Sequence, residues 1–586
     1  MSAAGSRWID ERQVLSGAVH YFRVHPEQWA DRLARLAALG LNTVETYVAW
    51  NFHEPRRGER DFTGWRDLPR FIELASSAGL DVIVRPGPYI CAEWEAGGLP
   101  AWLGFDGPVA LRTADPAFLT PVREFFADLL PRIAPLQATH GGPVIAVQVE
   151  NEYGSFADDA EYLRAIRDAL RDGGIDVPLF TSDGPTDLMV DGGTLPGITP
   201  TLNFGSRPAD AMRFLEERLP GTPFFCGEYW AGWFDHWGEE HHRRPGANAA
   251  GPVAEILQAG GSVNVYMAHG GTNFGLWSGA NHFDGQHQPT VTSYDSDAAV
   301  AEDGRLTEKF HALREVFVTA SGEQPPAHPA DPVFLAPRRL AVEHGAGLLP
   351  VLDALAEAGP EAPLPLSMER LRQSGGLTHY IATPILPRGE VELRITGLAD
   401  RATVFLDGER LGILSRNAPA ESLTVRGTGE RRRLDIVVES QGRVNYGPLL
   451  GEGKGILGDV LLQGSGVRKV TGWQHASAEL DRMPEFAGVA DGDVAGVSRA
   501  AVELDAPADA HLAFPGWGKG FVWLNGFLLG RHWEIGPQLT LYAPAPLWRA
   551  GRNEIVVLEM ERRGDTIEIR DVPELGAVTD YEEWKA

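Results

Sequence analysis

The first 320 residues alternate two patterns of hydrophobic and polar positions. Short runs rich in β-branched and aromatic residues are followed by longer stretches with the spacing of an amphipathic helix. The apolar runs cover residues 13–22, 42–50, 80–87, 143–152, 177–184, 199–205, 223–230 and 262–271, and the helical stretches between them include 26–40, 65–79, 159–174, a short one at 208–220 and a last one at 306–321. Eight strands alternating with eight helical stretches predict a (β/α)8 TIM barrel over residues 1–321 rather than an open sheet.

A different pattern follows a Pro-rich stretch at 322–336, which is typical of a linker. Helical periodicity largely stops there, and strand-like runs are separated by Gly, Asp and Pro turns. These runs lie at 379–386, 391–398, 402–408, 432–440, 458–464, 500–506, 520–530 and 553–561. They predict two β-sandwich (jelly-roll-like) domains over 337–465 and 466–586, and the run at 337–343 could belong to either sandwich.

Charge and cysteine content narrow the classes of function and the cellular compartment. Among 586 residues, 80 Asp and Glu outnumber 52 Lys and Arg, a net charge of −28 that disfavours nucleic acid or an anionic membrane as partner. Two cysteines form no disulfide framework, and the first residues lack the basic-then-apolar pattern of a signal peptide. We therefore expect a soluble, cytoplasmic protein.

Acidic residues stand at the ends of several predicted barrel strands, where barrel enzymes carry their catalytic groups. They are Glu45, Glu93, Glu95, Glu150, Glu152 and Glu228. Glu152 directly follows Asn151, and Glu228 lies in the aromatic run GEYWAGWFDHW. Tryptophan beside a carboxylate supplies an apolar wall that raises a pKa and a face on which a sugar ring stacks. Two carboxylates flanking one bond are what glycoside hydrolysis requires.

Several long motifs resemble the β-galactosidases of glycoside hydrolase family 35. They are TYVAWNFHEP (46–55), RPGPYICAEWEAGGLPAWL (85–103), GGPVIAVQVENEYGS (141–155), GEYWAGWFDHWG (227–238), SVNVYMAHGGTNFG (262–275) and TSYDSDA (292–298), followed by GRVNYG (442–447) and the stretch 514–542. The motifs occur in order over residues 13–560. The resemblance implies a catalytic barrel followed by β-domains, the second of them galactose-binding-like.

The resemblance assigns the two catalytic carboxylates. Glu152 in the VENEYG motif would be the acid/base, and Glu228 in the GEYW motif would be the nucleophile. Glu150 is a rival, because residues two apart on a strand share one face. The Asn-Glu motif favours Glu152, and the alternative for Glu150 is a polar residue of the barrel interior or rim that is held in an ion pair.

The resemblance also implies which residues contact galactose. They are Tyr47, Cys91, Ala92, Glu93, Asn151, Tyr266, Tyr294 and Trp230, with Asn151 expected to reach the 2-hydroxyl. Animal members have Phe-Tyr after the nucleophile, whereas this chain has Tyr229-Trp230. We further predict that Trp230, Trp233 and Tyr446 form an aromatic platform for the leaving sugar; the alternative is that the tryptophans only pack one domain against another.

Other motifs point more weakly to other chemistries. GKGILG (453–458) matches a bare dinucleotide-binding pattern but opens no predicted helix, and no G-x-S-x-G elbow is present. The acidic and histidine residues within 236–242 fit no standard zinc spacing. Cys91 and Cys226 lie at the ends of different strands, too far apart for a predicted disulfide. We therefore predict neither a metal nor a cofactor.

Together these features predict a retaining exo-β-galactosidase that acts on small oligosaccharides or galactosides, with β-1,3 linkages preferred. Two alternatives stay open: a galactose-binding protein whose barrel has lost activity, and a barrel glycosidase with another sugar specificity. Base rates favour a homodimer.

Overall fold

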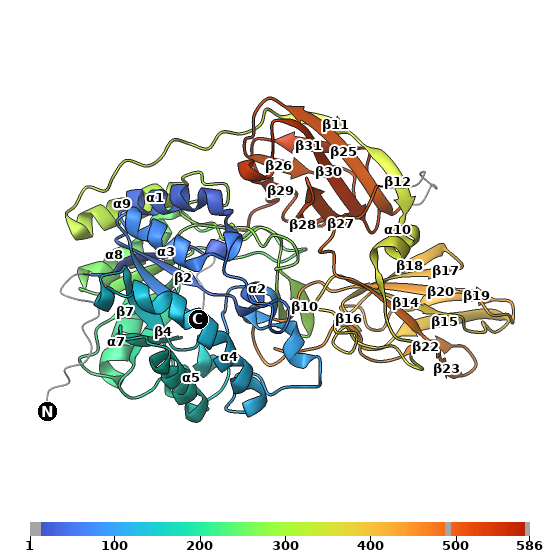
Figure 1. Ribbon diagram of the computed structural model, residues 1–586, viewed down its shortest axis with the longest axis horizontal. Coiled ribbons are helices and arrows are strands. Elements are labelled where there is room, and N and C mark those ends of the chain that lie inside the picture. Colours follow the sequence, from blue (N-terminus) through green and yellow to red (C-terminus); the bar gives the residue numbers. More distant parts are fainter. Residues whose placement is uncertain (1–12, 487–493, 580–586) are drawn as a thin grey trace.

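The N-terminal part of the chain forms a closed barrel of eight parallel strands, as predicted. A computed structural model describes residues 13–486 and 494–579. The barrel strands follow chain order, so each pairs with its predecessor and β1 closes on β8. Figure 1 shows the barrel, blue to green, beside the yellow-to-red β-sheets that follow it. They are β1 (Leu15–Ala18), β2 (Thr43–Tyr47), β3 (Asp81–Arg85), β4 (Val144–Gln148), β5 (Leu179–Asp183), β6 (Thr199–Phe204), β7 (Phe225–Trp230) and β8 (Ser262–Tyr266).

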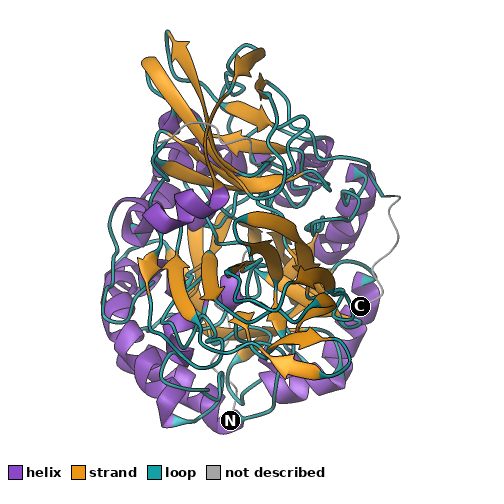
Figure 2. Cartoon of the chain, turned by 90° about the vertical axis from the view of Figure 1, so that its right-hand side faces the viewer, coloured by secondary structure: helices purple, strands orange, loops and turns teal. Residues whose placement is uncertain are grey.

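Helices connect these strands and lie at the periphery of the barrel, as the purple elements of Figure 2 show. Local sequence sets their ends: Asp159 caps the start of α5, and Gly40, with φ of 99°, ends α1. The helices of the barrel are α1 (Trp29–Leu39), α2 (Trp50–His53), α3 (Leu68–Ser77), α4 (Pro116–Ile133), α5 (Ala160–Asp172), α6 (Asp187–Gly193), α7 (Pro208–Arg218), α8 (Gly246–Gln258) and α9 (Glu308–Ser321). The sequence pattern predicts a short helix at 208–220, which is α7 with 11 residues. The helix α6 is shorter still, with 7 residues.

Two pairs of antiparallel sheets follow the barrel. The first pair has the strand orders β13-β24-β14-β20-β17-β18 and β19-β15-β22-β23, and the second pair has the orders β12-β25-β30-β27-β28 and β11-β31-β26-β29. The first pair comprises β13 (Glu357–Ala358), β14 (Leu377–Ala382), β15 (Gly389–Ile395), β17 (Arg401–Leu406), β18 (Glu409–Ser415), β19 (Leu423–Gly427), β20 (Leu434–Glu439), β22 (Val460–Gln463), β23 (Val467–Lys469) and β24 (Gln474–Ala478). The second comprises β11 (Arg338–Ala341), β12 (Glu343–Gly347), β25 (Gly496–Leu504), β26 (Ala510–Ala513), β27 (Lys519–Leu524), β28 (Phe527–Trp533), β29 (Thr540–Ala543), β30 (Gly551–Glu559) and β31 (Thr566–Arg570).

Strand pairing differs from the expected division near residue 465. The early strands β11 and β12 pair with β31 and β25, so the second pair of sheets begins before the first. The strands β23 and β24, beyond 465, complete the first pair by pairing with β22 and β14. Short strands that come early in the chain carry little information about distant partners, because pairing is set by the assembled core.

The predicted run at 520–530 is a hairpin rather than one strand. Asn525 and Gly526 have φ of 51° and 91°, the left-handed values that a tight turn between β27 and β28 requires. An Asn-Gly pair is a turn signal, and the continuous apolar run around it obscured that signal.

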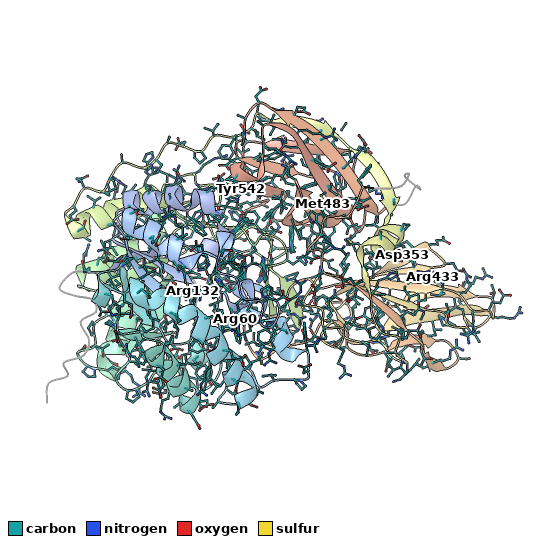
Figure 3. All side chains as sticks on the ribbon, viewed as in Figure 1. Arg60, Arg132, Asp353, Arg433, Met483 and Tyr542 are labelled. Atoms are coloured by element: carbon teal, nitrogen blue, oxygen red, sulfur yellow. The ribbon has the colours of Figure 1, made fainter. Side chains whose placement is uncertain are left out.

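The three parts pack against one another. The helix α10 (Leu348–Leu355) and the facing strands of both sheet pairs bury a shared core, against which Met483 packs (Figure 3). Tyr542 of β29 accepts a hydrogen bond of 2.9 Å from Gln28 beside α1, which joins the last sheet to the barrel. No helix among the described residues is both long and apolar enough to cross a membrane.

Candidate active site

The carboxyl ends of the barrel strands open into a cavity of about 410 Å³. Glu152, from the turn after β4, and Glu228, from β7, both line it. Of the predicted binding residues, Cys91, Glu93, Trp230, Trp233, Tyr266, Tyr294 and Tyr446 line it as well. Residues predicted from separate motifs thus meet around one space.

Two hydrogen bonds and an ion pair surround the carboxylate of Glu228. The Tyr47 hydroxyl donates to Glu228 Oε1 over 2.7 Å, and Arg85 Nη1 lies 2.7 Å from the same oxygen. The indole N–H of Trp230 donates to Oε2 over 3.3 Å. A buried guanidinium beside a buried carboxylate favours the charged state. This is the state that an attacking nucleophile requires.

Glu152 has a contrasting environment. Burial, together with the charge of Glu228, raises the pKa of Glu152 to about 7. The Asn203 side chain on β6 donates a hydrogen bond of 2.9 Å to Glu152 Oε1, which opposes the rise in pKa. A carboxyl group with a pKa near 7 carries a proton for a substantial part of the time at neutral pH, as a general acid must.

Glu150 is a structural residue. Arg112 donates to both of its carboxylate oxygens, over 3.0 and 2.8 Å, and Tyr162 donates to Oε1 over 2.7 Å. The strand β4 ends at Gln148, and Glu150 and Glu152 both have left-handed backbone, with φ of 59° and 44°. The turn therefore sends the two side chains to different partners, and the ion-pair alternative for Glu150 is confirmed.

The other strand-end acids also differ in their surroundings. Glu45 on β2 lies 3.7 Å from Arg85, and burial raises the pKa of Glu45 to about 7. Glu93 lines the cavity and accepts a hydrogen bond of 2.5 Å from Tyr294; burial raises its pKa. Glu95 instead accepts a hydrogen bond from the backbone N–H of Arg443 over 2.7 Å. Only Glu93 of these three lines the catalytic cavity.

Three residues predicted to contact galactose, Tyr47, Ala92 and Asn151, lie next to the cavity but are not among the residues that line it. The Oδ1 atom of Asn151 accepts a hydrogen bond from Arg85 and lies 2.9 Å from the Tyr47 hydroxyl, whose proton points to Glu228, while its buried Nδ2 group has no partner among the described residues. That free donor is suited to a substrate hydroxyl. Ala92 is fully buried and its carbonyl accepts from Arg23, so Ala92 packs beside the cavity rather than lining it.

The segment after β20 that contains Asn445 and Tyr446 reaches the mouth of the barrel. The backbone of Asn445 donates to Ala280 O over 2.9 Å, which ties residues after β20 to the loop after β8. The next residue, Tyr446, lines the cavity, and burial, with the nearby charge of Glu152, raises its pKa to about 12. The rings of Trp230 and Trp233 meet edge to face, 5.6 Å apart. All three platform residues thus border one space.

Sequence reasoning missed Arg85 and Asn203, which contact the two candidate carboxylates directly. Arg85 is the last residue of β3, and Asn203 is the penultimate residue of β6. Both lie at the strand ends where barrel enzymes carry catalytic groups, so a search there for bases and amides as well as acids would have found them.

The histidine-rich loop after β7 is held by internal pairs. His236 bonds Glu239 over 2.9 Å, while Asp235 bonds His241 over 2.7 Å and His242 over 2.9 Å. Among residues 13–486 and 494–579, no three His, Cys, Asp or Glu side chains are grouped to hold a metal ion. The two cysteines are free thiols.

Comparison with known proteins agrees with this geometry. The family model "Glycosyl hydrolases family 35" matches residues 8–320, more than half of the chain. The chain belongs to glycosyl hydrolase family 35. Models named "Beta-galactosidase, first all-beta domain" and "Beta-galactosidase, galactose-binding domain" match residues 365–479 and 497–553. It is therefore a glycoside hydrolase, and double displacement with retention is general to its family.

Relatives from distant organisms match almost end to end. The chain is 40% identical to a "Beta-galactosidase" of Mus musculus, with 93% of this chain and 89% of the mouse protein covered. It is 40% identical to one of Xanthomonas manihotis, covering 90% and 88%, respectively. Among solved structures, GH5_18 from Streptomyces cattleya is similar with a TM-score of 0.39 and 17% identity, over 54% of this chain and 83% of that chain.

Proposed function

We propose that this family 35 hydrolase is an exo-acting β-galactosidase that releases terminal, non-reducing β-galactose from oligosaccharides. The observation that carries the proposal is the unequal pair of carboxyl groups in one cavity. Glu228 is paired with a buried cation, and burial raises the pKa of Glu152 to about 7. A retaining glycosidase needs one charged and one protonated carboxyl group at the start of its cycle.

Each group has a defined role in the two steps. Glu228 attacks the anomeric carbon and forms a glycosyl-enzyme bond while Glu152 gives its proton to the departing glycosidic oxygen. Glu152, now ionised, then removes a proton from water, which attacks the same carbon and frees Glu228. The unpaired Nδ2 of Asn151 donates to the sugar 2-hydroxyl, a contact that strengthens as positive charge develops on the ring.

The support for an exo mode and for galactose comes from the relatives and from the walls of the cavity. The mouse and Xanthomonas manihotis relatives described above both carry the name "Beta-galactosidase". Tyr446 lines the cavity on a segment that is tied to the loop after β8, and we infer that this segment restricts the site to one terminal sugar. Trp230, Trp233 and Tyr446 would hold the leaving sugar, and a fixed platform of this kind favours one linkage, for which we propose β-1,3.

A panel of nitrophenyl β-glycosides tests this function directly. The β-galactoside should be hydrolysed much faster than the β-glucoside, β-mannoside and β-N-acetylglucosaminide, and galactose should be released with its β-configuration retained. Faster hydrolysis of another glycoside would replace the proposed specificity. Binding of galactose without hydrolysis of any member would favour the galactose-binding alternative.

A further inference from the structure

A second cavity, of about 450 Å³, lies where the barrel and both pairs of sheets meet. The barrel contributes Trp65 and Arg56, the loop after β8 contributes Trp277, the first pair of sheets contributes Gly375 and Glu479, and β28 contributes Phe527. It shares no lining residue with the catalytic cavity. Its volume is within the range of small-molecule binding sites.

Aromatic rings form much of its wall. Trp65 stacks on Phe527 with ring centroids 5.1 Å apart, and Trp277 packs edge-on against Phe52 at 5.8 Å. Trp65, Trp277 and Phe527 are only partly buried, so part of each ring remains uncovered by protein. Aromatic faces of this kind stack on the C–H surfaces of sugar rings as well as on other flat apolar groups.

Polar groups around these rings point to a neutral ligand. The cations Arg56 and Arg66 are accompanied by one more carboxylate than there are cations, from Glu95, Glu479 and Asp481. Arg56 bonds Glu479 over 3.1 Å and lies 3.5 Å from Asp481. A rim with a small excess of carboxylates gives no net attraction for nucleotides or other polyanions, yet it offers donors and acceptors for hydroxyl groups.

One buried donor is left unused. The indole N–H of Trp65 has no hydrogen-bond partner among the described residues, and the atom is shielded from solvent. A buried polar group without a partner costs free energy, and a ligand oxygen would remove that cost. Trp65 therefore combines a ring that lines the cavity with an unpaired N–H.

We propose that this second cavity is a non-catalytic saccharide-binding site that accepts a neutral mono- or disaccharide. Stacking on Trp65 and Trp277, hydrogen bonds from the Trp65 indole and the Arg56–Glu479 pair, and the near-neutral rim together match the chemistry of a sugar. The site goes beyond the hydrolytic function, because none of its residues contacts Glu152 or Glu228.

The two cavities are joined by short segments of chain. Glu93 lines the catalytic cavity and Glu95 the second one, while Trp94 between them stacks on Trp277 at 5.3 Å. The backbone N–H of Glu95 also donates to Trp277 O over 2.8 Å. A sugar held in the second cavity would therefore be retained close to the catalytic cavity without blocking it.

Gly375 allows the second cavity to be filled without removing any contact. A Cβ atom at Gly375 would meet only Leu276 Cδ1, at 3.9 Å, and its backbone is not in the left-handed region. Gly375→Phe should fill the space beside the aromatic wall, while Gly375→Ala, the matched control, adds one methyl group. Thermal unfolding of both variants establishes that each is folded.

The test uses the full chain carrying Glu228→Gln, so that added sugar is not consumed, and lactose as the probe. Crystals soaked in lactose should show a sugar against Trp65 and Trp277, and calorimetric titration should require two sites. Adding Gly375→Phe should weaken the second site at least about tenfold, whereas adding Gly375→Ala should preserve both sites.

Three results would overturn the proposal. They are no lactose against Trp65 and Trp277 in the Glu228→Gln protein, binding that is unchanged by Gly375→Phe, and sugar density in this cavity in crystals with no binding to it in solution. The proposed function is judged separately, by hydrolysis of the glycoside panel with the unaltered chain. The second saccharide site and the proposed hydrolytic function can therefore be refuted independently of each other.

Discussion

The two sides of the catalytic cavity give the same residue type opposite properties. On the Glu228 side, formed by β2, β3 and β7, Arg85 and Tyr47 stabilise negative charge on the carboxylate. On the Glu152 side, formed by the turn after β4 and by β6, burial dominates and one amide, Asn203, partly opposes it. Since both residues are glutamates, the difference shows that the surrounding cations and hydrogen bonds, and not the residue type, determine which one acts as nucleophile and which as acid.

Removing the carboxylate on the Glu228 side should have the largest effect. Glu228→Gln should reduce kcat on nitrophenyl β-galactoside by a factor on the order of 10⁴ or more, because no glycosyl-enzyme bond can form. The matched control is Glu240→Gln, on an exposed residue of the same loop, which should leave kcat unchanged. Retention of a tenth of the activity by Glu228→Gln would remove this residue from the nucleophile role.

Removing the carboxylate on the Glu152 side should have a smaller effect that depends on the substrate. Glu152→Gln should lower kcat/KM on lactose about 10²–10⁴-fold, because the leaving sugar needs a proton. A dinitrophenyl galactoside, whose leaving group departs unprotonated, should lose far less in the same measurement. Equal losses on both substrates would mean that Glu152 is not the acid.

The aromatic platform should affect only substrates with a second sugar. Tyr446→Ala should cost about 1–3 kcal/mol in kcat/KM on a β-1,3-linked galactosyl disaccharide, from lost ring contact, and less on nitrophenyl galactoside. Tyr446→Phe is the control that keeps the ring. Trp230→Ala would remove two interactions at once, because the indole of Trp230 also donates a hydrogen bond to Glu228. Equal losses on both substrates from Tyr446→Ala would exclude the platform.

The smallest expected effect is a shift in the pH dependence of kcat/KM. Since Glu152 must be protonated for the first step, kcat/KM should fall as pH rises through about 7, the raised pKa of this group. The Asn203 hydrogen bond stabilises the charged form of Glu152, so Asn203→Ala should move this alkaline limb to higher pH. A limb that moves to lower pH, or stays fixed, would show that another group controls it.

The barrel could be predicted from sequence because its signals are local. Each strand is a short apolar run followed by a helix with its own capping residue, such as Asp159 of α5, so order along the chain equals order in the sheet. The sheets after residue 337 could not be assigned to their pairs in this way. The strand β12 meets β25 about 150 residues later, and no local pattern encodes that pairing.

The site was predictable where one residue type carries the chemistry, and not where neighbours determine it. Glu152 and Glu228 were identified from their motifs, whereas Arg85 and Asn203 matter only through contacts made after folding. Glu150 was ambiguous because its role depends on Arg112, a residue 38 positions away. Cytoplasmic location, the homodimer and the absence of a cofactor stay predictions.

The central claim is that Glu228 is the nucleophile and Glu152 the acid, and trapping of the covalent intermediate tests it most directly. With 2,4-dinitrophenyl 2-deoxy-2-fluoro-β-galactoside, the fluorine slows both steps while the good leaving group permits the first, so the glycosyl-enzyme accumulates. Peptide mass spectrometry should place the sugar on Glu228. A label on Glu152 or Glu150, or release of inverted product with no label, would contradict the account.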